Sequence, residues 1–198
     1  MTGWRVWAHS AFYGVGLILS SRPAAAHLVQ TGLGPVYDGV AHFVVSPEYL
    51  APIVGAAIYA GFGGKAPARR AIVMLPLFWF AGSLLGELPR APPLILPTWL
   101  VLIGIGAFVA ADLPLPAALR IALCSMVGIA LGYSNGLIAA GAADPLRSAL
   151  GATAAVFIVT SLASAAAAAT SGWIRIVFRV LGSWIAASGL LALGWALH

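Results

Sequence analysis

The chain has 198 residues, of which 62% are hydrophobic and 8% are charged. So few charged side chains cannot cover the surface of a soluble domain of this size, and the mean hydropathy of +1.01 indicates lipid as the main solvent. At about 20 residues per span, the length allows roughly six or seven helical spans. The excess of 10 basic over 5 acidic residues then points to cytoplasmic loops of a membrane protein and not to nucleic-acid binding.

The first 26 residues have the pattern of a secretory signal peptide. Arg5 precedes a short apolar stretch at 11–20, and Ala24 and Ala26 supply the small side chains that signal peptidase requires before its cut. Cleavage there would make His27 the mature N-terminus, with a free α-amine. An uncleaved first helix is the alternative, and both readings place His27 on the outer side of the membrane.

Residues 27–198 are expected to form a single transmembrane domain, an all-α bundle of six spans. Residues 28–45 read as a loop that leads into a short helical piece near the outer interface. Ser46 and Pro47 are a helix start signal, with serine as N-cap and proline at the first helical position. The six expected spans are 48–62, 71–85, 94–111, 118–139, 146–169 and 173–198.

The distribution of basic residues gives the expected orientation. If residue 27 is outside and six spans follow, the outer side receives Arg90 and Arg147. The cytoplasmic side receives six basic residues, Lys65, Arg69, Arg70, Arg120, Arg175 and Arg179. This imbalance agrees with the positive-inside rule. We therefore expect a multi-pass protein of a bacterial-type inner membrane, with both ends of the mature chain on the outer side.

Ligand-type side chains cluster directly after the signal segment. Asp38 and His42 are four residues apart, so on a helix a carboxylate oxygen and an imidazole nitrogen could meet one cation. Asp38 could instead only orient the ring of His42, or both could lie in an inert interfacial loop. Ionisable groups at membrane depth are costly and mark ion or substrate pathways. The membrane setting therefore raises the weight of the metal-site interpretation.

His27 and Glu48 extend this cluster. A mature N-terminal histidine offers its amine and its ring nitrogen together, a chelate that suits nickel(II) or copper(II). His27 could equally be no more than the residue that follows the cut. Glu48 stands at a helix start, where a carboxylate favours the positive end of the helix dipole, and it is near enough to be an outer ligand. The sequence thus predicts a metal site of His27, Asp38 and His42, with Glu48 beside it.

The expected span at 118–139 carries two patterns. Three glycines recur every four residues on one helix face, Gly128, Gly132 and Gly136. Small residues at this spacing let two membrane helices approach closely. The same span holds the polar group Tyr133, Ser134 and Asn135, and Asn135 requires a partner within the bundle. Interhelical hydrogen bonding and the lining of a path towards Asp38 and His42 both account for this group.

The other candidate residues have structural explanations. Asp112 and Asp144 fit turns or helix caps, and Glu87 with Arg90 reads as an interfacial pair. Cys124 is the only cysteine, which excludes a disulfide within the chain and suits a small core residue. The sequence contains no nucleophile–base pair, P-loop, dinucleotide fingerprint or His-Glu-x-x-His motif. It therefore indicates neither an enzyme nor an ATP-driven pump.

The layout of the chain resembles the HupE/UreJ family. The resemblance rests on the signal peptide, on His27 at the cut, on Thr-Gly-Leu-Gly-Pro at 31–35, and on Asp-Gly-Val-Ala-His at 38–42 before six spans. In that family an early helix carries a histidine and an Asp-His pair, whereas here Asp38 and His42 are separated. A later histidine-rich motif is replaced by residues 131–136, which contain no histidine. The chain therefore looks like a divergent branch.

The resemblance implies a nickel or cobalt permease associated with hydrogenase or urease maturation. We expect an inner-membrane permease for a first-row divalent ion, most plainly Ni²⁺, with Co²⁺ or Cu²⁺ as other cargoes and no tightly bound cofactor. His27, Asp38 and His42 would capture the ion, and Tyr133, Ser134 and Asn135 would line its path. The alternative is a membrane-bound accessory subunit that binds copper or nickel and delivers it to a partner enzyme without transport.

Overall fold

The computed structural model describes residues 30–89, 91–92 and 96–197, and within them the chain forms seven α-helices and no strand. The expected all-α class is thereby confirmed. The expected signal peptide and His27 lie outside the described residues. The helices are α2 (Pro35–Val45), α3 (Pro47–Phe62), α4 (Lys65–Gly86), α5 (Thr98–Ala111), α6 (Ala117–Ala139), α7 (Pro145–Ala168) and α8 (Trp173–Ala196).

The helices α4, α6, α7 and α8 are long and apolar enough to cross a membrane. A fifth crossing results if α2 and α3, which meet at a bend of 76°, are counted as one broken span. Helix α5 is apolar but has only 14 residues, about 21 Å at 1.5 Å per residue, against about 30 Å of hydrocarbon. The described part is thus a multi-pass bundle with four or five crossings by length and composition, and the count of six stays a prediction.

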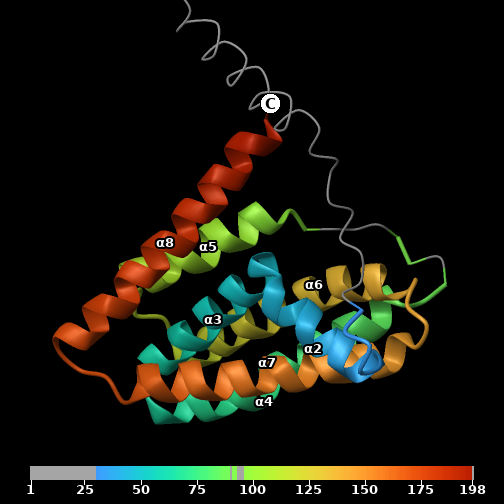
Figure 1. Ribbon diagram of the computed structural model, residues 1–198. Helices are drawn as coiled ribbons and strands as arrows, with labels where there is room; N and C mark the ends of the chain where they lie inside the picture. The colour runs from blue at the N-terminus through green and yellow to red at the C-terminus, as the bar shows by residue number, and fades with distance from the viewer. Residues whose placement is uncertain (1–29, 90, 93–95, 198) are drawn as a thin grey trace, which may run out of the picture.

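The bend between α2 and α3 follows from the sequence around Pro47. Proline disfavours the helical conformation in the residue before it, and Ser46 accordingly has an extended backbone with φ −99° and ψ 95°. Ser46 occupies the N-cap position that the sequence predicts, although its side chain makes no capping hydrogen bond. The expected short helical piece before it is α2, which crosses one end of the bundle (Figure 1).

Helices α4 and α6 lie in direct backbone contact. A Cβ atom added at Gly132 would lie 2.1 Å from the carbonyl oxygen of Trp79, and one at Gly136 would lie 2.0 Å from that of Ser83. A Cβ at Gly128 would meet the oxygen of Leu75 at 2.7 Å. The predicted glycine stripe of α6 therefore packs against α4, as its helix-packing interpretation requires.

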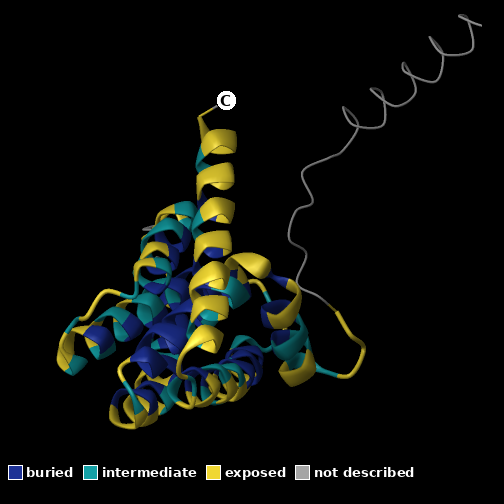
Figure 2. Ribbon diagram, turned by 90° about the vertical axis from the view of Figure 1, so that its left-hand side faces the viewer, coloured by how far each residue is buried: buried dark blue, intermediate teal, exposed yellow. Residues whose placement is uncertain are grey.

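Helix α7 packs against α2, α3 and α4 and so joins both ends of the bundle (Figure 1). Near its start a Cβ at Gly151 would lie 2.0 Å from the oxygen of Val36 in α2, and near its end a Cβ at Gly61 of α3 would lie 2.6 Å from the oxygen of Ser164. Helices α5 and α8 pack on each other through Gly106, Gly182 and neighbouring residues, and both also contact α3. Most of α8 beyond this contact is exposed, as its mainly yellow ribbon in Figure 2 shows.

Basic side chains tie together the end of the bundle that α2 does not cover. The guanidinium of Arg120 is buried and donates to the carbonyl oxygens of Tyr59 (2.8 Å), Leu113 (2.8 Å) and Leu115 (3.0 Å). Arg175 forms a two-pronged ion pair with Asp112, at 2.6 and 2.9 Å. The expected turn or cap role of Asp112 is confirmed, because it ends α5 in a left-handed conformation with φ 51°.

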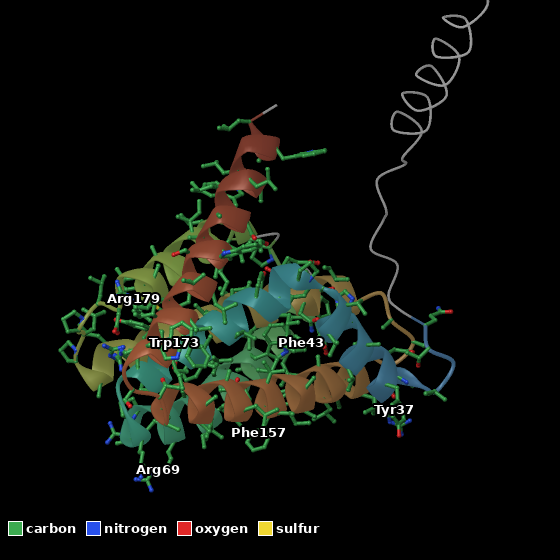
Figure 3. All side chains as sticks on the ribbon, turned by 60° about the vertical axis from the view of Figure 1, so that its left-hand side comes forward. Tyr37, Phe43, Arg69, Phe157, Trp173 and Arg179 are labelled. Carbon is green, nitrogen blue, oxygen red and sulfur yellow. The ribbon has the colours of Figure 1, made fainter. Side chains whose placement is uncertain are left out.

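The two ends of the bundle therefore differ in charge. Figure 3 shows Arg69 and Arg179 at one end and Tyr37 of α2 at the other. The charged starts of α4 and α8 share the first end with Arg120, since Arg175 also donates to the oxygen of Phe62. Arg147 lies at the start of α7, beside α2, and pairs with Asp144. The described basic residues thus divide between the ends as the sequence predicts.

The tight α4–α6 contact predicts a large effect from a single methyl group. In Gly132→Ala the new Cβ would collide with the backbone of Trp79, so the helices must separate, and we expect a loss of about 1–3 kcal/mol in unfolding free energy. Gly104→Ala is the matched control because no atom lies within 4 Å of its Cβ position. Reversible denaturation in detergent measures both, and equal stabilities would contradict the packing described here.

The Asp112–Arg175 pair predicts a measurable coupling. A double-mutant cycle with Asp112→Asn and Arg175→Gln should give a coupling of about 1 kcal/mol, because the pair is two-pronged and its side chains are only 18% and 33% exposed. The Asp144–Arg147 pair is the control, with side chains 37% and 68% exposed, and it should give under about 0.5 kcal/mol. Equal coupling in the two pairs would show that the ion pair does not fix α8 to α5.

Candidate metal-binding site at the bend between α2 and α3

Asp38 and His42 lie on one continuous helix, so the structure excludes the loop alternative for this pair. Asp38 is in the first turn of α2 and is partly exposed. Its Oδ1 accepts hydrogen bonds from the backbone N–H (2.6 Å) and the hydroxyl (2.7 Å) of Thr31. These bonds hold the segment before α2 against the helix. Oδ2 receives no hydrogen bond from the described residues and keeps its lone pairs for a ligand.

His42 lies one turn further along and is buried, with 5% of its surface exposed. Its Nε2 atom has no hydrogen-bond partner among the described residues. The ring lies 5.8 Å from that of Tyr49, which contacts Trp79 at 5.6 Å, and Phe43 contacts the same tryptophan at 5.5 Å. Buried polar atoms are nearly always paired. This buried imidazole nitrogen therefore lacks the partner that a bound ion could supply.

The bend itself adds partial negative charge next to His42. The last carbonyl groups of α2 have no helical partners beyond Val45, because Pro47 has no N–H and Ser46 is extended. The negative end of the helix dipole and its free carbonyl oxygens favour a cation. Broken membrane helices use such ends to coordinate ions in transporters. The Glu48 carboxylate, exposed in the first turn of α3, also acts electrostatically on His42.

Of the three residues predicted to bind the metal, the structure describes only Asp38 and His42. His27 lies outside the described residues, so its distance to Asp38 and His42 is not defined. Within the described ranges no group of three or more His, Cys, Asp or Glu side chains is arranged to hold a metal ion. The geometry therefore presents one buried nitrogen and one partly free carboxylate on the same helix, and the full ligand set stays a prediction.

A second acidic region lies at the same end of the bundle. A pocket of about 320 Å³ between the start of α2 and the turn before α7 is lined by Asp38, Asp144 and Ser148, among others. Asp144 caps α7, because its side chain accepts from the N–H of Arg147 at 3.1 Å, which confirms its expected cap role. Glu87 follows α4, and burial raises its pKa, with a further rise from the Asp144 carboxylate.

Sequence reasoning missed the proximity of Glu87 and Asp144. It assigned Glu87 to Arg90, which lies outside the described residues. The two acids are far apart in the chain, and no spacing rule connects the end of one helix with the start of another. Only the packing of α4 against α7 brings them within electrostatic range.

The polar group of α6 is occupied by hydrogen bonds within the protein. The hydroxyl of Tyr133 donates to the oxygen of Pro92, and that of Ser134 donates to Ala130 one turn earlier, at 3.2 Å. The amide of Asn135 is buried and donates to the hydroxyl of Ser83 in α4 at 3.3 Å. The interhelical hydrogen bond expected of Asn135 is therefore present. Its alternative role in lining a path stays a prediction.

No match was found among curated protein sequences or among solved structures. A model of the HupE/UreJ protein family, in contrast, matches residues 15–192. The match covers most of the chain, including the bend between α2 and α3, all of α4, α6 and α7, and most of α8. The chain therefore belongs to the HupE/UreJ family of membrane proteins.

Proposed function

We propose that this protein is an inner-membrane permease for a divalent first-row transition metal ion, with Ni²⁺ as its main cargo. The HupE/UreJ family is associated with nickel and cobalt transport or with metalloenzyme maturation, and the multi-pass bundle suits transport. The single observation that carries the proposal is the unpaired Nε2 of buried His42 at a broken helix. Imidazole nitrogen is a preferred ligand of nickel.

In this proposal the ion is captured at the end of the bundle that holds α2. Nε2 of His42 supplies the nitrogen ligand, while the carbonyl oxygens at the end of α2 and Oδ2 of Asp38 offset the positive charge. The α-amine and ring of His27 would complete the ligand set, with Glu48 as an outer ligand. The chain carries no nucleotide-binding motif. Inward movement would follow the membrane potential, which contributes about 2.3 kcal/mol per charge per 100 mV.

The orientation is part of the proposal. Cytoplasmic loops of membrane proteins are enriched in Lys and Arg, so the end with Lys65, Arg120 and the start of α8 faces the cytoplasm. The bend between α2 and α3 then opens to the outer side, where the ion is captured.

Substitution of His42 tests the capture site. We expect His42→Gln to weaken Ni²⁺ binding by the purified protein about tenfold or more and to abolish Ni²⁺ accumulation in cells, because it removes the imidazole nitrogen. Phe43→Leu is the matched control, since it alters the neighbouring buried side chain and leaves every ligand in place. Calorimetry measures binding, and radioactive nickel measures accumulation.

The outcomes of this experiment separate the two functional hypotheses. Binding and accumulation that are lost in His42→Gln and kept in Phe43→Leu support the permease. Binding that depends on His42 without any accumulation supports the accessory subunit that delivers metal to a partner enzyme. Binding and accumulation that are the same in both variants would overturn the role of His42.

Single cysteines test the orientation. The only natural cysteine, Cys124, is fully buried, so it gives little background labelling. Ala143→Cys lies in the exposed turn before α7 and Ala66→Cys in the exposed start of α4. A membrane-impermeant maleimide should label the first in intact right-side-out vesicles and the second only after permeabilisation. The opposite labelling pattern would reverse the orientation proposed here.

A further inference from the structure

Helix α7 carries two buried hydroxyl groups that have no hydrogen-bond partner among the described residues. Thr160 and Ser164 have no exposed surface, and neither Oγ1 of Thr160 nor Oγ of Ser164 has a hydrogen-bond partner among the described residues. The two residues are one turn apart, so their side chains share one face of the helix. The opposite face of the helix is exposed, since Leu162 is 69% and Ile158 is 56% exposed.

Other hydroxyl groups of this bundle behave differently. Within the described helices, several donate to the carbonyl oxygen four residues earlier, namely those of Ser134, Thr153, Ser161, Ser183 and Ser188. Through this bond the hydroxyl groups of Ser and Thr ordinarily find a hydrogen-bond acceptor inside a lipid-embedded helix. Thr160 and Ser164 do not use it. Their hydroxyl groups are therefore directed to the interior of the bundle without a partner there.

The position of these hydroxyl groups relates them to His42. The start of α7 lies against α2, where Gly39 contacts the backbone of Ser148, and its later part lies against Gly61 near the end of α3. Thr160 and Ser164 therefore follow the α2 contact along α7 towards the basic end. The ring of His42 begins a buried aromatic wall that reaches α4 through Tyr49. The helices that carry this wall, α2, α3 and α4, all pack on α7.

A third unpaired atom belongs to the same set. Nε1 of Trp79, in α4, is buried and has no hydrogen-bond partner in the described part of the chain. An indole N–H is a donor only, so it cannot bind a cation, but it can donate to a water molecule that accompanies one. The imidazole nitrogen of α2, the indole N–H of α4 and the two hydroxyl groups of α7 are polar groups that a partly hydrated ion could meet in succession.

We propose that the hydroxyl groups of Thr160 and Ser164 bind the hydrated metal ion transiently on its way from His42 to the cytoplasmic end. The ion path then follows the inner face of α7 and not the polar group of α6. This inference rests on the proposed permease function. Hydroxyl oxygens are weak, neutral ligands that can replace one water at a time. Conduction requires sites that an ion can leave as readily as it enters. The hydroxyl groups of the rival α6 group already serve as donors within the protein.

The path is closed where α3 meets α7. A Cβ at Gly61 would lie 2.6 Å from both the carbonyl oxygen of Ser164 and the Cβ of Ala167. Passage of an ion therefore requires these two helices to separate at this point. The contact consists of small side chains, so it holds the helices together without interlocking bulky groups that would have to change rotamers.

Isosteric substitutions test the path. We expect Thr160→Val and Ser164→Ala each to lower Ni²⁺ uptake by about tenfold, while Ni²⁺ binding to the purified protein is unchanged, because His42 is intact. Their thermal stability should be equal to or above that of the parent, because an unpaired buried hydroxyl is removed. Thr153→Val and Ser161→Ala are the matched controls on the same helix, since their hydroxyl groups are bonded to the helix backbone, and they should transport normally.

The His42→Gln variant, measured in parallel, distinguishes the two proposals. Uptake that is lost in His42→Gln but normal in Thr160→Val and Ser164→Ala would overturn the path and leave the permease. Uptake reduced to the same extent in the Thr153 and Ser161 controls would also overturn the path, because it would show only a general effect on α7. A parent protein that binds Ni²⁺ and accumulates none would overturn the permease and the path together.

Discussion

Close backbone contact between helices is the constraint on which the rest of this structure depends. In lipid, apolar side chains gain little by leaving their surroundings, so helices associate through van der Waals packing and a few hydrogen bonds. This chain meets that requirement with glycines that place one backbone against another, between α6 and α4 at Gly132 and between α2 and α7 at Gly39 and Gly151. Larger side chains at these points would separate the helices that form the core.

Most polar atoms that this tight packing buries are hydrogen-bonded within the protein. Asn135 reaches Ser83, Arg120 reaches three carbonyl oxygens, and the Cys124 sulfhydryl donates to Ala56. Against this background, Nε2 of His42, Nε1 of Trp79 and two hydroxyl groups of α7 are buried without a partner among the described residues, which is unfavourable. Such atoms are retained where a ligand, an ion or a water molecule uses them, which connects the packing of this bundle with its proposed transport function.

The two ends of the bundle differ in their polar groups, and in the proposed permease one end captures the ion while the other anchors the helices. At one end a broken helix leaves carbonyl groups and His42 without partners, which suits the temporary binding of a cation. At the other end Arg120 and Arg175 fill the corresponding places, so the ends of α3 and α5 are closed by guanidinium groups. In the proposed permease, a cation that reaches this positively charged end would not be retained there. The asymmetry is thus consistent with one-way delivery along the membrane potential.

The sequence by itself determined the helical class, the apolar helices, the break at Ser46-Pro47, the division of basic residues and the family, because hydropathy, proline chemistry, charge and motif order are local properties of the chain. It also indicated the Gly132 contact from a four-residue spacing. Only the tertiary structure decided that Asn135 bonds to Ser83, and that His42, Thr160 and Ser164 are buried without partners among the described residues. These facts depend on which helices become neighbours and at what depth, and no periodicity within one helix specifies its neighbours.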